Sequence, residues 1–318
     1  MSSGSSRDQT PQAARTLRVD AHAGGQRIDN FLMKTLIKVP KSRVYRLLRT
    51  GQVRVNGGRK KPHYRLQQGD EVRTPPLVDA EKRVARIPEA VIARVTRDVI
   101  YEDDAVIVLN KQPGLAVHGG SGLVFGLIEA LRQARDCKTL ELAHRLDRDT
   151  SGCLLVAKHR PALVPLQQAF RDHRVEKTYL ALTAGRWTQT ECTVRKPLRK
   201  NQLQSGERMV HIDETGKPAV SHFRVVEQFE GAALVSVRIE TGRTHQIRVH
   251  AASLGHPIVG DEKYGDRQLN QQLRQAGCKR LYLHAEHLVL LDQAAYRFHA
   301  PPDQQWQADM VRLRPSSL

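Results

Sequence analysis

The chain has 318 residues, 40% of them apolar, and a formal net charge of +18 at pH 7. Such a charge indicates binding to polyanions such as nucleic acid, or less often to an anionic membrane surface. No run approaches about 20 apolar residues, and the four cysteines lie far apart without a Cys-x-x-Cys pair, which argues against a membrane span, a zinc ribbon and a disulfide-stapled secreted fold. We expect a cytoplasmic protein with one large or two unequal domains.

The first part of the chain predicts a short tail and a small domain. Residues 1–18 are polar, lack an apolar signal-peptide core and are expected to be disordered. Within residues 19–76, apolar residues recur at helical spacing in QRIDNFLMKTL and in KSRVYRLLRTG, where Gly51 suits a helix C-terminus. QVRVNGG then alternates apolar and polar residues, and Asn56-Gly57 is a strong hairpin signal, with YRLQQGDEV as the return segment. We predict two short helices followed by a β-hairpin.

The second of these helices and the hairpin form a cationic segment. Between Lys41 and Lys61 there are eight basic residues and no acid. A solvated helix face usually mixes charges of both signs, whereas a purely cationic surface can neutralise RNA phosphates. The segment resembles the S4 domain, a small RNA-binding module, through its Ser-Arg, Gly-x-Val-x-Val-Asn-Gly and Gly-Asp elements in that order. The candidate RNA-contacting residues here are Arg43, Arg46, Arg49, Lys60 and Lys61.

The rest of the chain is predicted to consist of a linker and a larger domain rich in short strands. Residues 77–93 show no clear period and contain Pro88, so we expect a linker. Residues 94–314 contain many short β runs, such as AVIVLN, CLLVAK, TYLALT, VSHFRVVE and LVSVRIE. Helical stretches interrupt them: PALVPLQQAFRDH, THQIRVHAASLG and DQQWQADMVRL, the last with Asp303 as its N-cap. Because strands and helices do not alternate strictly, we predict an α+β domain with a mixed, mostly antiparallel sheet.

One stretch of this second domain concentrates charged residues. AHRLDRDTSG, residues 143–152, places two acids among two arginines and a histidine, just ahead of an apolar run. In an extended segment Asp147 and Asp149 would lie about 7 Å apart, too far to share a proton, so we expect one to be functional and the other structural. Asp149 precedes Thr-Ser-Gly and can cap a turn. Asp147, flanked by cations, suits a nucleophile or an electrostatic stabiliser, and the alternative is a structural Asp–Arg ion pair.

The same stretch resembles the signature of the RluA-type pseudouridine synthases, which isomerise uridine to pseudouridine in RNA. EKTYLAL (176–182), TGRTHQIRVHAASLGHPIVGDEKYG (241–265) and LYLHA (281–285) resemble further elements of that family in the same order. The resemblance implies a reaction without cofactor or metal. It also implies that Asp147 is the catalytic aspartate, that Arg248 pairs with it, and that Tyr179 stacks on the base. From the residues alone, Tyr179 would be a core aromatic and Arg248 a surface arginine.

With an S4 module in front, the chain resembles the branch of this family that acts on 23S ribosomal RNA. We expect this RNA to be bound by both the S4 domain and the catalytic cleft. We also expect a monomer without membrane contact. A target uridine must be flipped out of its stack. Arg145 is then a candidate to fill the vacated space, while His144 contacts RNA or only braces the loop; candidates for phosphate contacts are Arg243, Arg199 and Lys200. Two other classes stay open: a non-catalytic rRNA-binding or assembly factor, and a glycosidase that uses Asp147 with a second carboxylate.

Overall fold

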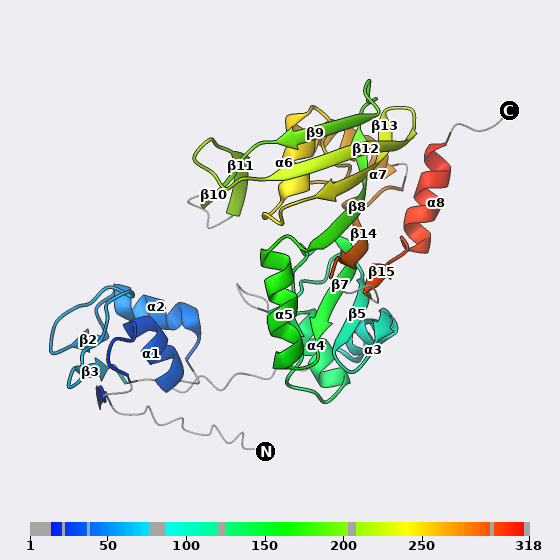
Figure 1. Cartoon of the computed structure of the whole chain (residues 1–318). Helices are drawn as coiled ribbons and strands as arrows, with labels where there is room; N and C mark the ends of the chain where they lie inside the picture. The colour runs from blue at the N-terminus through cyan, green and yellow to red at the C-terminus, as the bar shows by residue number, and fades with distance from the viewer. Residues whose placement is uncertain are drawn as a thin grey trace, which may run out of the picture. The chain divides into compact units, whose positions relative to one another are not determined.

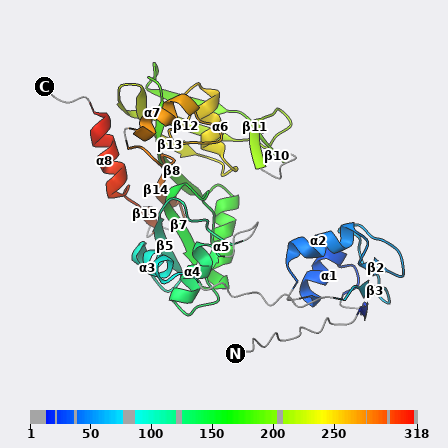
Figure 2. The same ribbon diagram turned by 180° about the vertical axis from the view of Figure 1, so that it is seen from behind.

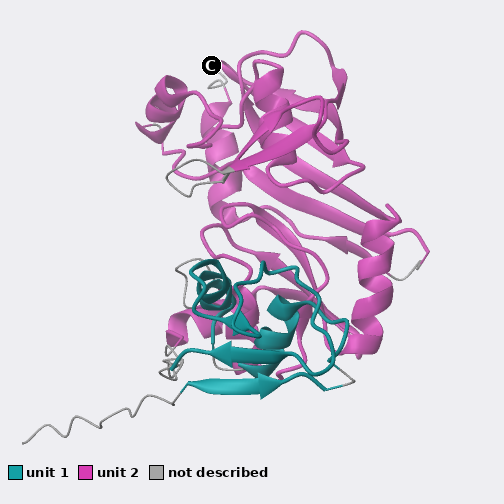
Figure 3. Cartoon of the chain, turned by 90° about the vertical axis from the view of Figure 1, so that its left-hand side faces the viewer, with its two compact units in different colours: residues 1–86 teal, residues 87–318 magenta. Residues whose placement is uncertain are grey.

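The structure, a computed structural model, describes residues 14–20, 23–36, 39–76, 87–119, 125–202, 208–275, 277–292 and 296–314. It divides the chain into two compact units, residues 1–86 and residues 87–318 (Figure 3). The predicted tail up to residue 13 and the predicted linker from 77 to 86 lie outside the described residues. The two units are therefore described separately.

The first unit consists of two helices and a small antiparallel sheet. The helices are α1 (Ile28–Thr35) and α2 (Lys41–Arg49), and the strands β1 (Arg15–Arg18), β2 (Arg54–Val55) and β3 (Glu71–Thr74) pair in the order β1-β3-β2. The two predicted helices are confirmed. The predicted turn is present, with positive φ at Asn56 and Gly57 and a bridge between Val55 and Gly58, but the strand that pairs with β2 is β3, which overlaps the predicted return segment only at its end. Strand β1 lies within the segment predicted as a tail, because four residues are too few to show a period and its pairing partner β3 is distant in sequence.

A ten-stranded sheet runs through the second unit (Figures 1 and 2). Its path is β4-β5-β7-β14-β8-β13-β12-β9, with β15 on β14 and β6 on β7, and every pairing is antiparallel except that of β7 with β14. The predicted α+β architecture with a mixed, mostly antiparallel sheet is confirmed. The bounds are β4 (Val99–Glu102), β5 (Val106–Lys111), β6 (Glu141–Leu142), β7 (Ser151–Ala157), β8 (Val175–Ala184), β9 (Glu191–Arg195), β12 (Val220–Gln228), β13 (Ala232–Ile239), β14 (Leu283–Leu290) and β15 (Arg297–His299).

Helices and one extra hairpin flank this sheet. They are α3 (Glu89–Arg97), α4 (Leu127–Ala134), α5 (Arg160–Arg171), α6 (Gln246–Ser253), α7 (Arg267–Gln275) and α8 (Gln304–Leu313), with β10 (Leu198–Gln202) and β11 (Arg208–Ile212) forming the hairpin. In Figure 1, α4 and α5 lie beside β5 and β7, whereas α6 lies beside the β12–β13 end of the sheet. Each half has its own apolar core, and Tyr179 on β8 packs against both. The candidate site lies where these halves meet.

Helices α3, α4 and α7 were not predicted from the sequence. Helix α3 begins inside the predicted linker, where Pro88 precedes it and Val95 is buried on its inner face. Helix α7, RQLNQQLRQ, has no buried residue, so it offers no apolar period of useful length. The helices predicted over residues 161–173, 244–255 and 303–313 are all present, and Asp303 accepts a hydrogen bond from the Trp306 N–H as the predicted N-cap. In the described ranges, no helix is long and apolar enough to cross a membrane.

Candidate active site

The loop that carries Asp147 is fixed at its C-terminal end by a glycine. Gly152 lies at φ 106°, where side chains are rarely accommodated, and pairs with Ala285 of β14 at the one parallel junction of the sheet. A Cβ at this position would lie 2.1 Å from the Ala285 carbonyl oxygen. The Thr-Ser-Gly that follows the two acids therefore provides close contact between β7 and β14.

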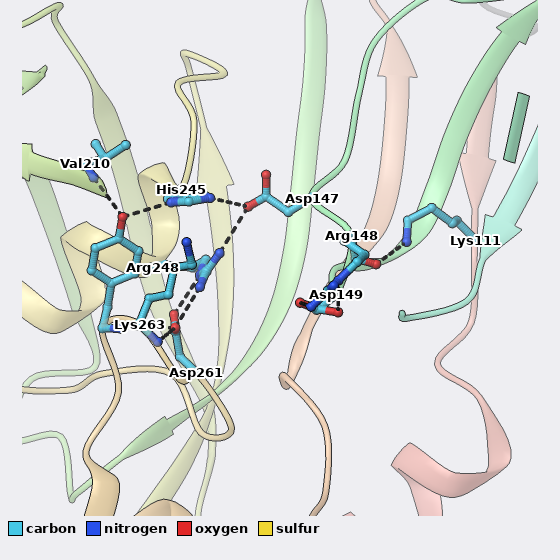
Figure 4. A network of polar contacts seen from close by, with 10 residues as sticks. Lys111, Asp147, Arg148, Asp149, Val210, His245, Arg248, Asp261 and Lys263 are labelled. Atoms are coloured by element: carbon cyan, nitrogen blue, oxygen red, sulfur yellow. Dashed lines mark hydrogen bonds and ion pairs between the residues drawn. The ribbon is translucent and has the colours of Figure 1, made fainter. Parts of the chain in front are cut away.

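A buried lysine holds the same loop from the other side. Lys111, at the end of β5, is fully buried, and its Nζ donates to the carbonyl oxygens of Gln112 (2.9 Å), Leu115 (2.9 Å) and Arg148 (2.8 Å). Figure 4 shows the contact with Arg148 beside Asp149. Burial lowers the pKa of Lys111 to about 7. The lysine was not among the predicted site residues, because its loop partner lies 37 positions away in sequence.

Asp149 does not cap the turn as expected. Its carboxylate pairs with the adjacent Arg148 guanidinium, 3.1 Å from Nε to Oδ1, and is 47% exposed. The exposed arginine offers two N–H donors to this carboxylate, and Lys111 already binds the loop carbonyl at Arg148. The turn thus depends on Lys111 and Gly152, and the predicted capping role of Asp149 is wrong.

Asp147 is contacted by two groups from the start of α6, the N-cap residue His245 and Arg248 in the first turn (Figure 4). Its Oδ2 lies 3.5 Å from Nη1 of Arg248 and 3.7 Å from Nε2 of His245. The carboxylate itself is 24% exposed, so it remains accessible from the cleft. The predicted Asp147–Arg248 pair is thus present, with a histidine that the sequence patterns did not single out.

The orientation of Arg248 is fixed by a second carboxylate, that of Asp261. Its Nε and Nη2 donate to the two oxygens of Asp261, at 2.7 Å each, and the Asp261 side chain is fully buried. Burial favours a higher pKa for Asp261, but the Arg248 hydrogen bonds and charge outweigh it and hold that pKa below its ordinary value. Burial likewise acts to lower the pKa of Arg248, and Asp261 more than compensates. This bidentate pairing fixes the plane of the guanidinium while Nη1 points to Asp147.

One cleft brings together all three predicted catalytic residues and two arginines predicted to contact RNA. Arg145, Asp147, Tyr179, Arg243 and Arg248 all line it. Burial and the nearby charge of Asp147 raise the pKa of the Tyr179 phenol. The ring lies on β8 at the seam of the two apolar cores, which places an aromatic surface beside the carboxylate.

His144 does not reach this cleft. Its Nε2 accepts the N–H of Leu155 at 3.0 Å, and its ring stacks on Phe170 at 4.8 Å between centroids. Burial lowers the pKa of His144 to about 3. Of the two roles considered for this histidine, the contacts favour bracing of the loop against β7 and α5 over contact with RNA.

A second, cationic hollow adjoins the cleft. The β10–β11 hairpin and the loop before α6 form it, and it shares Gly242 and Arg243 with the cleft. Arg199, Lys200 and Lys217 lie along its wall. A polyanion that leaves the cleft past Arg243 would therefore meet further positive charge.

In the first unit, one groove gathers most of the predicted RNA-contacting residues. Arg46, Arg49, Lys60 and Lys61 line it together with Arg59. Arg43 is outside the groove, and its Nε is buried without a hydrogen-bond partner among the described residues. In the part of the chain that the structure describes, no cluster of three or more His, Cys, Asp or Glu side chains is arranged to hold a metal ion.

Comparisons with known proteins agree with these two units. Residues 26–72 match the S4 domain and residues 105–253 match the family model of RNA pseudouridylate synthases. The chain is 52% identical over 278 residues to a ribosomal large subunit pseudouridine synthase C of Pasteurella multocida, covering 86% of this chain and 85% of the relative. It is 48% identical over 314 residues to the protein of that name from Escherichia coli K12, covering 96% and 98%. The structure of human RNA pseudouridylate synthase domain containing 1 superposes with a TM-score of 0.58 at 28% identity, covering 70% of this chain and 89% of that one.

Proposed function

Because this chain belongs to the RNA pseudouridylate synthase family and isomerises uridine to pseudouridine in RNA, we propose that its substrate is 23S ribosomal RNA and that Asp147 is the catalytic carboxylate. The relatives named ribosomal large subunit pseudouridine synthase C support the choice of RNA. The motifs YEDDAVIVLN and RTHQIRVH also most resemble the C type. The observation that carries the assignment is the convergence of Asp147, Tyr179 and Arg248 on one cleft.

The reaction cleaves the C–N glycosidic bond, turns the uracil and joins C5 to the sugar. A carboxylate can act as the nucleophile, at the sugar C1′ or at the base, because it forms a covalent intermediate that divides the difficult step. Arg248, anchored by Asp261, positions Asp147 for either route. No metal or cofactor is required in this scheme.

Tyr179 provides the face on which the base stacks. Its raised pKa keeps the phenol protonated at neutral pH, so acceptance of the final proton would require the environment of the hydroxyl to change when RNA binds. Stacking does not depend on ionisation, and we assign that role to Tyr179 first.

The target uridine reaches the cleft by flipping out of the RNA, at a cost of a few kcal/mol that is lowest in a loop or bulge. Arg145 is exposed at the mouth of the cleft and fills the vacated space. Arg243, Arg199 and Lys200 contact the flanking phosphates along the adjoining hollow. The groove of Arg46, Arg49, Lys60 and Lys61 holds another part of the RNA backbone.

We propose that the unit containing residues 19–76 is the S4 domain and the unit containing residues 94–314 the catalytic domain, in a cytoplasmic monomer. The glycosidase alternative needs a second carboxyl group that is protonated and can donate to the leaving group. The acid that the structure places behind the site, Asp261, is fully buried against Arg248 with a lowered pKa. It therefore does not suit the role of a general acid.

The test uses a 23S rRNA transcript incubated with purified protein without added metal or cofactor. Pseudouridine is mapped by carbodiimide-dependent stops in reverse transcription, with the Asp147→Asn variant alongside. We expect stops with the wild-type protein only. Tight, salt-sensitive binding without any stops would instead favour the binding or assembly factor, and release of free uracil would favour a glycosidase.

A further inference from the structure

His245 occupies a strained position between Asp147 and Tyr264. It has φ 54° and ψ 19°, a left-handed conformation that costs energy for a residue other than glycine and persists where surrounding contacts determine it. Its Nε2 lies 3.7 Å from Oδ2 of Asp147, and its Nδ1 lies 2.8 Å from Oη of Tyr264. The imidazole thus bridges the proposed catalytic carboxylate and a tyrosine.

The contacts of the Tyr264 hydroxyl fix where its proton lies. The N–H of Val210, on β11, donates to this oxygen at 2.9 Å, and a donor cannot accept the hydroxyl proton in return. Among the contacts described for this hydroxyl, Nδ1 of His245 is the group that can accept it. A neutral imidazole whose Nδ1 accepts must carry its own proton on Nε2, the nitrogen that faces Asp147.

We propose that Tyr264 and His245 are positioning residues for Asp147, in which the Tyr264 hydroxyl selects the imidazole tautomer that directs Nε2–H at Oδ2. Arg248 approaches the same oxygen from Nη1, at 3.5 Å. His245 and Arg248 together hold the carboxylate through Oδ2, so that the other oxygen, Oδ1, faces the flipped nucleotide. The inference rests on the proposed catalytic role of Asp147, and it deepens that role.

Three substitutions separate positioning from structural support. Tyr264→Phe keeps the ring but removes the proton that selects the tautomer. His245→Gln keeps an N–H donor at the position of Nε2, within reach of Asp147. The shorter side chain of His245→Asn reaches only the position of Nδ1, but Asn is better tolerated than Gln at a positive φ. A structural role therefore favours Asn over Gln, and a positioning role favours Gln over Asn. Tyr296→Phe, which removes a hydroxyl bonded to Asp103 away from the cleft, is the matched control.

Turnover should fall while RNA binding is kept. We expect Tyr264→Phe to lower kcat about tenfold, equivalent to roughly 1.4 kcal/mol, with KM within about twofold. His245→Gln should retain more activity than His245→Asn, and Tyr296→Phe should match the wild type. Thermal unfolding of each variant identifies any that fails to fold.

The tautomer itself is measured by NMR of the full-length protein with 15N-labelled histidine, with the His245 signals assigned by their loss in His245→Gln. We expect the proton on Nε2 in the wild type, and a changed tautomer in Tyr264→Phe. A proton on Nδ1 in the wild type, an unchanged tautomer in Tyr264→Phe, equal losses in the two tyrosine variants, or Asn equal to Gln would each overturn the proposal. Because this signal needs no turnover, it is independent of the result with Asp147→Asn.

Discussion

The substitution Asp261→Asn tests how strongly the site depends on the buried pair behind it. The change keeps the size of the side chain but removes the charge opposite Arg248. The Arg248 side chain is only 10% exposed and that of Asp261 is fully buried, so solvent does not replace the lost interaction. Removing one partner of such a buried pair typically costs roughly 3–5 kcal/mol, and Asp147, 24% exposed and 3.5 Å from Nη1, offsets the remaining charge only in part.

This cost should be visible both in stability and in activity. A domain of the size of unit 87–318 loses about 2–4 °C in Tm per kcal/mol, so we expect Tm to fall by roughly 6–20 °C. Below the new Tm, single-turnover rates should fall more than RNA affinity, because Arg248 is released from the plane that directs Nη1 to Asp147. Calorimetry and single-turnover pseudouridine formation measure the two effects.

The neighbouring Glu262→Gln is the matched control. Its carboxylate is 81% exposed and lies 3.2 Å from Arg274, and such surface pairs contribute at most about 1 kcal/mol. If Asp261→Asn left Tm and rate as close to the wild type as this control does, the claim that the buried Arg248–Asp261 pair stabilises the fold and orients Arg248 would be refuted.

Three further predictions concern the loop, the pH response and the S4 groove. Gly152→Ala should destabilise by roughly 2–5 kcal/mol in urea unfolding, because its Cβ would meet the Ala285 carbonyl; Gly231→Ala, also at positive φ but with open space around it, should cost less. With a folded pKa of about 3 against the ordinary 6.5, His144 stays neutral while the unfolded state binds a proton, so stability should fall as pH drops from 6.5 towards 3, and His144→Gln should flatten this slope. Arg49→Gln should lower the salt dependence of RNA binding, log K against log salt, by about 0.7–0.9, and an unchanged slope would remove Arg49 from the phosphate contacts.

Local patterns in the sequence predicted the elements that have a clear period. The two helices of the first unit, the strand after AHRLDRDTSG and helix α8 with its Asp303 cap all follow from spacing and capping residues. Helix α7 did not, because its polar sequence buries no residue. Its Asn270 side chain instead accepts from the Gly260 N–H and donates to the Asp261 carbonyl oxygen, contacts that no local pattern predicts.

The candidate site was predicted only as far as recognisable motifs extend. Asp147 and Arg248 are 101 positions apart, and their pairing came from family resemblance rather than from spacing. Lys111, His245 and Asp261 were missed, because each acts through a contact that the fold creates with a distant residue. His245 and Asp261 do lie within the motif 241–265 that was recognised in the sequence, but the motif alone did not predict a role for either residue.

The central claim is that Asp147, and not the acid two positions away, performs the chemistry. The most direct measurement compares single-turnover pseudouridine formation and RNA affinity for Asp147→Asn and Asp149→Asn on the same 23S rRNA transcript. We predict that Asp147→Asn abolishes turnover with affinity within a few fold of the wild type, whereas Asp149→Asn, at an exposed ion pair with Arg148, retains turnover. Retained turnover in Asp147→Asn would contradict the account.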